Sequence, residues 1–121
     1  IHLAPELYEK EVKELLVRRA IRTMLSNFPN LKKIDIEEAK RLPKECKLIA
    51  FRVCFIFNER YEELYNKYGY DYDFHYVVRL KGSWYEKMGS SSIHKVKFQF
   101  EPWEYGTGYV YDSRIVFFIE Q

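Results

Sequence analysis

The twelve residues CKLIAFRVCFIF, at positions 46–57, restrict the fold more than any other stretch of this chain. At a period of two, one side of the segment carries five large apolar residues, from Ile49 to Phe57. The other side is also apolar, apart from Arg52. A strand that is apolar on both sides must be covered on both faces. The sequence therefore predicts a central strand, with other elements packed above and below its sheet.

Two helices are predicted before this strand and one after it. Apolar residues recur at helical spacing over 5–27, and Pro5 suits the first turn of that helix. A shorter helix is expected over 36–42, because Asp35 can cap its start and Pro43 stops it. A third is expected over 59–68.

Strands dominate the rest of the chain. Alternating residues predict a strand over 70–81, and Lys81-Gly82-Ser83 is typical of a hairpin turn leading into the next strand. Further strands are expected over 95–100 and 109–119. Helices followed by antiparallel strands indicate an α+β fold, with the N-terminal helices packed on an antiparallel sheet. A length of 121 residues suggests one domain, spanning residues 1–121.

Charge and cysteine content limit the function classes. Residues 1–60 carry 13 Lys/Arg and 9 Asp/Glu, so neither this half nor the whole chain, at +2, has the basic excess of a dedicated nucleic-acid binder. No apolar run approaches the ~20 residues of a membrane span, and no signal peptide is visible. Cys46 and Cys54 would lie about 26 Å apart on an extended strand, too far to form a disulfide.

These observations lead to several expectations about the protein's surroundings. Free thiols fit a reducing compartment such as the cytoplasm. No paired-ligand spacing predicts a metal site, and no motif calls for a cofactor. We expect no nucleic-acid or membrane partner. Because the chain starts at Ile1, we expect that it can be a fragment with further sequence upstream. The sequence does not determine an oligomeric state.

His75 is the residue most suited to chemistry. It follows Asp73 on the more polar side of the predicted strand, and Arg79 lies four residues further along the same side. A histidine in this position can titrate near neutrality and can serve as a general base.

The surrounding motif resembles part of a known family. The run DFHY at 73–76, then Arg79, then GSWYEKMG at 82–89, is similar to a stretch of papain-like cysteine hydrolase domains of the amidase/peptidase type. That stretch reads D-[YF]-H-[WFY], a nearby Arg, then G-x-W-S-H-K-P-G. The resemblance spans about residues 40 to 95. It implies a papain-like core, or its C-terminal portion, that acts on an amide bond of a protein or peptide.

The resemblance also implies site residues. His75 would be the general base for a cysteine nucleophile, and Cys46 is the visible candidate for that nucleophile. An acceptor that orients the imidazole could be Asp73, Asp112 or Gln99. The catalytic set is then His75, Cys46 and Asp73. We expect the binding set to be Tyr76, Arg79, Trp84 and Trp103.

The chain departs from the pattern where Tyr85-Glu86-Lys87-Met88 replaces S-H-K-P, and the long first helix contains no cysteine. Three explanations stay open. The nucleophile could lie upstream of Ile1, the site could be degenerate, or the resemblance could be a coincidence of tyrosine-rich hairpin sequence.

A non-catalytic protein-interaction domain is the alternative. Aromatic residues make up 18% of the chain. Several lie in or beside predicted turns and edge strands, where they would form an exposed surface: Trp84, Tyr85, Trp103, Tyr105, Tyr109 and Tyr111. Tyr and Trp are favoured at interfaces. Such a domain could also bind a peptide by strand addition.

Overall fold

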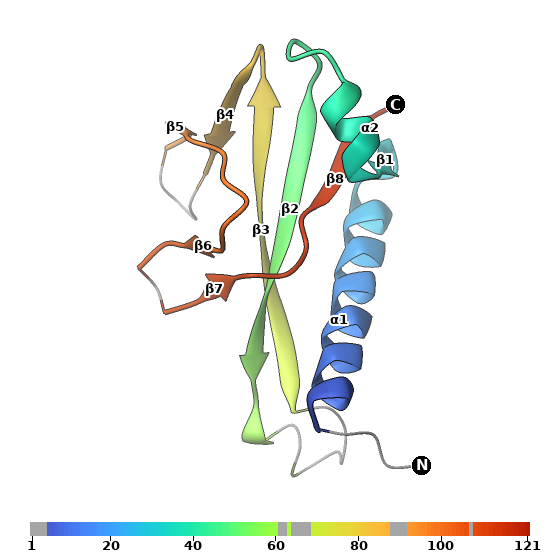
Figure 1. Ribbon diagram of the computed structural model, residues 1–121, viewed down its shortest axis with the longest axis vertical. Helices are drawn as coiled ribbons and strands as arrows, with labels where there is room; N and C mark the ends of the chain where they lie inside the picture. The colour runs from blue at the N-terminus through green and yellow to red at the C-terminus, as the bar shows by residue number, and fades with distance from the viewer. Residues whose placement is uncertain (1–4, 61–62, 64–68, 88–91, 107) are drawn as a thin grey trace.

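The fold is α+β, as predicted, and its centre is one antiparallel sheet (Figure 1). The structure is a computed structural model that describes residues 5–60, 63, 69–87, 92–106 and 108–121. Six of its strands form the sheet in the order β1-β8-β2-β3-β4-β5. Their bounds are β1 Leu31–Ile34, β2 Leu48–Phe57, β3 Tyr70–Leu80, β4 Ser83–Glu86, β5 His94–Val96 and β8 Val116–Glu120.

Strand β2 is the covered central strand that the apolar run predicts. Its first seven residues, from Leu48 to Cys54, are all buried. It pairs with β3 along its whole length and with β8 over Ile49–Phe51. Apolar side chains on both sides of the strand are buried, because a different layer covers each face of the sheet.

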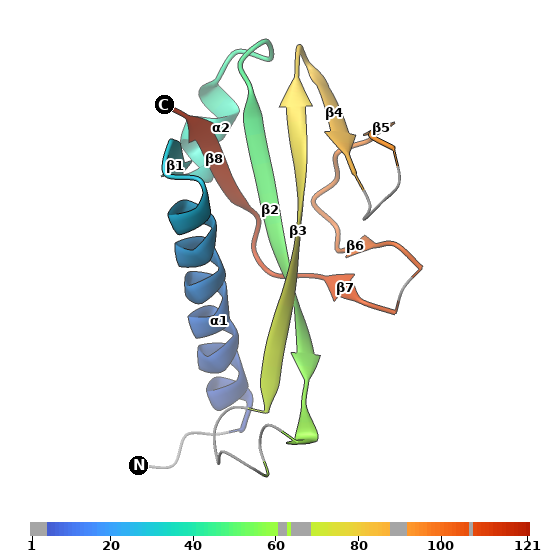
Figure 2. The same cartoon turned by 180° about the vertical axis from the view of Figure 1, so that it is seen from behind.

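Helix α1, Pro5–Asn27, covers one face of the sheet, and Figure 2 shows it from behind, running beside β2 and β8. Its buried residues Val17, Ala20 and Met24 pack against the side of β2 that carries Phe51 and Val53. Burying this apolar stripe stabilises the helix more than its intrinsic propensity does.

The opposite face is covered by a shorter helix and by the chain that follows β5. Helix α2, Ile36–Arg41, begins as predicted at Asp35, whose side chain accepts a hydrogen bond of 2.8 Å from the backbone N–H of Glu38. Strands β6, Trp103–Glu104, and β7, Val110–Tyr111, form a separate two-stranded sheet. Trp103 and Tyr111 are buried in the same cluster as Ala39 of α2.

A two-residue turn joins β3 to β4. Lys81 and Gly82 have φ angles of 51° and 83°, the left-handed values that this tight hairpin requires. Leu80 therefore pairs with Ser83, and Arg79 pairs with Trp84. The sequence predicts the position of this turn but makes it one residue longer. That difference decides which face of the sheet each residue of β4 occupies.

Two predicted strands differ from those observed. The strand expected over 95–100 is limited to His94–Val96, and the one expected over 109–119 is divided into β7 and β8. The chain leaves the small sheet and joins the large one between these two strands. There the backbone N–H of Ser113 bonds to the carbonyl of Val53. The helix expected over 59–68 lies largely outside the described residues.

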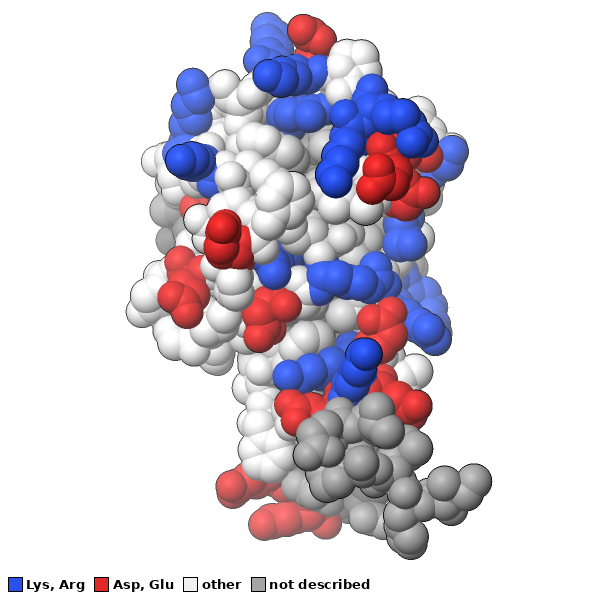
Figure 3. Space-filling model, viewed as in Figure 1, with Lys and Arg blue, Asp and Glu red and all other residues white. Residues whose placement is uncertain are grey.

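Charge is unevenly distributed over the surface. On the face seen in Figure 3, Lys and Arg side chains gather towards the end that carries α2 and the β3–β4 turn. No helix in the described part of the chain is long and apolar enough to span a membrane.

Candidate functional site

His75 lies in the middle of β3, on the face opposite α1, where it pairs in register with Arg52 of β2. Three aromatic rings surround its imidazole. The ring centroids of Tyr105, Tyr111 and Trp103 lie 4.7, 5.8 and 6.3 Å from that of His75. Only 13% of the His75 side chain is exposed.

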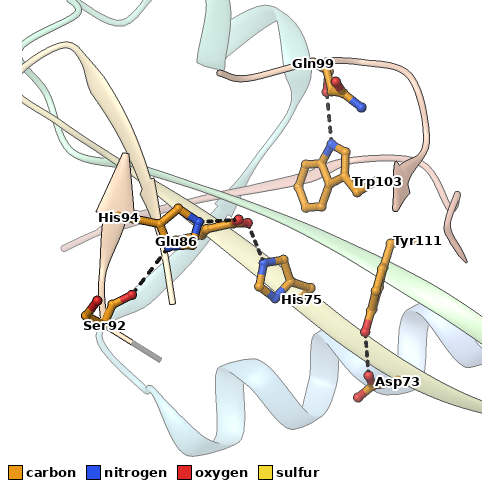
Figure 4. A network of polar contacts seen from close by, with 8 residues as sticks. All are labelled: Asp73, His75, Glu86, Ser92, His94, Gln99, Trp103 and Tyr111. Atoms are coloured by element: carbon orange, nitrogen blue, oxygen red, sulfur yellow. Dashed lines mark hydrogen bonds and ion pairs between the residues drawn. The ribbon is translucent and has the colours of Figure 1, made fainter. Parts of the chain in front are cut away.

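The histidine is held by a buried carboxylate. Glu86, the last residue of β4, has 6% of its side chain exposed, and its Oε2 lies 3.0 Å from Nε2 of His75. The other oxygen, Oε1, lies 3.0 Å from Nε2 of His94, which pairs with Glu86 across β4 and β5. Figure 4 shows both imidazoles turned towards this one carboxylate. Two ring nitrogens therefore satisfy a carboxylate that burial would otherwise penalise.

The contacts distinguish the two histidines. An ionised carboxylate only accepts hydrogen bonds, so each Nε2 donates to Glu86. Nδ1 of His94 faces a second acceptor, the carbonyl oxygen of Ser92, at 3.4 Å. Nδ1 of His75 has no such partner among the described residues, so in the neutral ring its lone pair is available. His75 is therefore the better placed of the two to accept a proton.

Tyr105 lies close to the same carboxylate. Burial raises the pKa of Tyr105, and the adjacent Glu86 carboxylate raises it further. The phenol therefore stays neutral in the folded protein over the physiological pH range and adds another polar group beside Glu86.

Asp73 was expected to orient His75, and the structure gives it a different partner. Its Oδ2 accepts a hydrogen bond of 2.7 Å from the hydroxyl of Tyr111 (Figure 4). Glu86 occupies the position that was expected for Asp73, Asp112 or Gln99. Alternation along β3 places Asp73 on the same face as His75, but their side chains are two residues apart and point to different neighbours.

Neither thiol contacts His75. Cys46 lies two residues before the start of β2 and is exposed. Its carbonyl oxygen accepts hydrogen bonds from the Arg79 guanidinium. Arg79 is four residues from His75 along β3, a separation of about 13 Å in an extended strand. Cys54 pairs with Asp73 and is buried, and this burial raises the pKa of the Cys54 thiol. The structure thus does not assemble a Cys46–His75 pair.

Arg52 fixes the loop that carries the aromatic residues. Its guanidinium donates hydrogen bonds to the carbonyl oxygens of Ser113, Phe100 and Glu101, at 2.8, 3.1 and 2.7 Å. It also lies 5.3 Å from the ring centroid of Trp103. One buried cation from the central strand therefore holds both ends of the segment that packs over His75.

The residues expected to bind a partner lie in different environments. Trp103 is 4% exposed, so the expectation of an exposed Trp103 is wrong, because its ring fills the core beneath Arg52. Trp84 stacks on Phe98 with centroids 4.5 Å apart. The side chain of Arg79 bonds to carbonyls of the chain itself. Tyr76, by contrast, is 43% exposed.

A cavity of about 500 Å³ lies where β4 diverges from β3. His75 and Glu86 reach it from one side, and the remainder of its wall is apolar and basic. The other lining residues are Lys47, Tyr76, Val78, Leu80, Tyr85, Lys87 and Ile93. A smaller cavity of about 160 Å³ also borders Glu86, on the side of Trp103 and Tyr105.

Sequence reasoning missed Glu86 and His94. The available signal was the two-residue turn at Lys81-Gly82, whose register places Trp84 opposite Arg79 and therefore Glu86 on the His75 face. His94 could not be found in this way, because its position depends on where β5 joins the sheet.

Within the described ranges, no group of three or more His, Cys, Asp or Glu side chains is arranged to hold a metal ion. Comparisons of the chain with family models, with curated proteins and with solved structures found no match.

Proposed function

We propose that this chain carries an acid–base site of the amide-hydrolase type, with His75 as the general base and Glu86 as the residue that positions it. The observation that carries the proposal is the 3.0 Å contact between His75 Nε2 and the buried Glu86 carboxylate, beside a cavity large enough for a substrate group. A base whose far nitrogen is held by a carboxylate has a fixed tautomer and a stabilised imidazolium.

His75 carries one proton from the attacking water to the leaving nitrogen. His75 Nδ1 accepts a proton from an attacking water as the water oxygen bonds to the amide carbonyl carbon, and the carbonyl electrons move to its oxygen. When the C–N bond breaks, the imidazolium returns that proton to the leaving nitrogen. The products are a carboxylic acid and an amine. During the reaction Glu86 stabilises the imidazolium by charge and by its hydrogen bond.

Water is the proposed nucleophile because of where the thiols lie. The resemblance to papain-like cysteine hydrolases implies a thiolate beside the base. Cys46, however, is held near Arg79, and Cys54 is buried next to Asp73. Neither thiol contacts His75, whose imidazolium would be the cation that stabilises a catalytic thiolate, and burial raises the pKa of the Cys54 thiol.

Hydrolysis of a panel of peptide p-nitroanilides and peptide amides tests the proposal. We expect activity in the unmodified chain and in the Cys46→Ser, Cys54→Ser double variant, and its loss in His75→Gln. If the unmodified chain is active and the double serine variant is inactive, the attacking group is a thiol and not water. If no form hydrolyses any member of the panel above the uncatalysed rate, the catalytic proposal is wrong.

A second candidate, a non-catalytic protein-interaction domain, is favoured by one specific observation. Several large apolar side chains are exposed. Phe74, Tyr76 and Leu80, on the α1 side of β3, are 38%, 43% and 44% exposed, and Ile93, just before β5, is 69% exposed. Contiguous exposed apolar residues mark interaction sites more often than isolated ones do. In this alternative the His75–Glu86–His94 cluster only stabilises the fold.

Substitution at His75 separates the two candidates. If the protein is only an interaction domain, His75→Gln should leave partner binding unchanged, and no hydrolysis should be detected in any variant. If it is a hydrolase, the same substitution should abolish turnover while the variant stays folded.

A further inference from the structure

We infer that the unpaired edge of β3 binds an extended peptide segment with acidic and apolar side chains, by addition of a strand. The inference deepens the proposed function, on which it rests for the identity of the substrate class, because the peptide would pass directly beside His75. Binding itself does not depend on catalysis. Three independent features of the described residues carry the inference: the backbone edge, the apolar surface and the charge.

The backbone edge follows from the hairpin register. Leu80 and Ser83 flank a two-residue turn, so they exchange backbone hydrogen bonds, and Val78 does the same with Tyr85. Within the described residues, the pairing of β3 with β4 ends there. Backbone groups that point to one edge repeat every second residue, so those of Tyr76 and Phe74 point to the same edge as those of Val78.

One hydrogen bond supports this assignment. The backbone N–H of Tyr72, the next residue in the same series, donates to the side chain of Asp71 at 2.8 Å and therefore does not pair with β2. Phe74 and Tyr76 are left as the residues whose N–H and C=O groups can pair with an added strand. An exposed strand edge of this kind is a template for such pairing.

The surface beside this edge is apolar. Helix α1 packs over β8, β2 and parts of β3, but Tyr76 and Leu80 on the same side of β3 remain exposed. The cavity of about 500 Å³ lies on this surface. Side chains of an added strand alternate between the two faces, so every second side chain could enter the cavity.

Charge selects the kind of peptide. Lys47 and Lys87 line the cavity, and Lys95 is exposed on the neighbouring β5. Lys47 already pairs with Glu120 at 2.6 Å. Glu86 is the one carboxylate among the described residues that line this cavity, and two histidines already occupy it. Lysine is therefore in excess over carboxylate among the described side chains that line the cavity, which favours a carboxylate on a ligand side chain that enters it.

The test uses a synthetic heptapeptide, acetylated and amidated, in which Glu alternates with Val and Ile. It is titrated into the ¹⁵N-labelled full chain and followed by amide chemical shifts and by fluorescence anisotropy. We expect saturable binding with the largest shifts at Phe74, Tyr76 and Lys87. The same peptide with N-methyl groups on the Val and Ile nitrogens should bind about 10-fold more weakly, because it loses backbone donors.

Charge variants provide the second arm. Lys87→Glu should weaken binding by about 5-fold or more, whereas Lys10→Glu on exposed α1 should not change it. A heptapeptide with Lys in place of Glu should not bind. The inference is overturned if the two charge forms bind equally, or if the shifts map elsewhere. It is also overturned if vesicles of phosphatidylserine and phosphatidylcholine bind the chain but the peptide does not.

The same experiment separates this inference from the proposed function. His75→Gln should keep peptide binding while it loses hydrolysis. Binding without hydrolysis in the unmodified chain would leave the docking edge in place and overturn the catalytic proposal. Hydrolysis of p-nitroanilides without binding of the peptide at Phe74 and Tyr76 would leave the catalytic proposal in place and overturn the docking edge.

Discussion

Glu86 Oε2 lies 3.0 Å from His75 Nε2 at the point where β4 separates from β3. The contact joins neighbouring strands across the opening of a cavity, so one side of the pair is packed against aromatic rings and the other can meet a ligand. The carboxylate is almost fully buried, yet both of its oxygens have partners. Its environment thus satisfies the requirement that buried charge be hydrogen-bonded.

Glu86→Gln should impair the site without unfolding the chain. The amide keeps the shape of the side chain but no longer accepts at both oxygens or stabilises an imidazolium. We expect kcat/KM for amide hydrolysis to fall by about 10²–10⁴-fold and the free energy of unfolding by about 1–3 kcal/mol. The pH profile of kcat/KM should change shape as well as height, which a purely structural residue would not cause. Steady-state kinetics and urea unfolding measure these effects.

A carboxylate away from the site provides the control. Glu101 is exposed, and Glu101→Gln should leave both kinetics and stability unchanged. If Glu86→Gln retains full activity with an unaltered pH profile, Glu86 does not position His75.

Arg52→Leu should lower the free energy of unfolding by about 3 kcal/mol. The substitution removes the donor that three carbonyl oxygens share, at Ser113, Phe100 and Glu101. Arg52→Lys should recover only part of this loss, because an ammonium cannot reproduce the planar guanidinium geometry. Urea unfolding provides the measurement, with the exposed Arg41→Leu as control. Equal stability of the Leu and Arg forms would show that the 100–113 segment is held by packing alone.

Apolar periodicity could predict much of the fold. The double-sided run at 46–57 identifies a central strand, and helical spacing identifies α1. Burial requires apolar residues at regular spacing in both elements, so the sequence shows both patterns clearly. Strand β1 was missed because two lysines, Lys32 and Lys33, lie between its buried ends, and four residues are too few to show a period.

The site could be predicted only in part, because its geometry depends on strand register. His75 was identified from its own position on β3. Glu86 required the exact length of the Lys81-Gly82 turn, since a shift of one residue exchanges the faces of β4. Trp103 was expected on the surface because its loop contains Pro102 and Gly106. The buried Arg52 pulls that loop onto the sheet, and this long-range contact has no local signature.

The two thiols should react with iodoacetamide at very different rates. Cys46 is exposed, whereas burial raises the pKa of the Cys54 thiol and also blocks access to it. At pH 8 we expect mass spectrometry to find one alkyl group per chain, on Cys46, and two after unfolding in urea. Cys46→Ser should then remain unmodified until it is unfolded. Fast alkylation of either thiol at pH 6 that slows in His75→Ala would instead indicate a thiolate–imidazolium pair.

The protein should lose stability in alkali because of two phenols, the buried Tyr111 and the partly buried Tyr105. Burial is the main reason why the pKa values of Tyr105 and Tyr111 are raised, and the Glu86 and Asp73 carboxylates add to it. In the unfolded chain both titrate near ~10. Their contribution is therefore complete below about pH 10 and is lost as the pH rises towards the folded pKa values, because the unfolded state releases these protons first. Urea unfolding at pH 9 and pH 11 should detect the loss.

Phenylalanine variants identify the residues responsible for this alkaline loss. Tyr105→Phe and Tyr111→Phe each remove a phenol whose pKa is raised in the folded state, so each should reduce the difference in stability between pH 9 and pH 11. Phenolate absorbance near 295 nm gives an independent reading, since two of the 11 tyrosines should resist ionisation until the chain unfolds. A single titration step for all tyrosines while the chain is still folded would contradict the raised pKa values of Tyr105 and Tyr111.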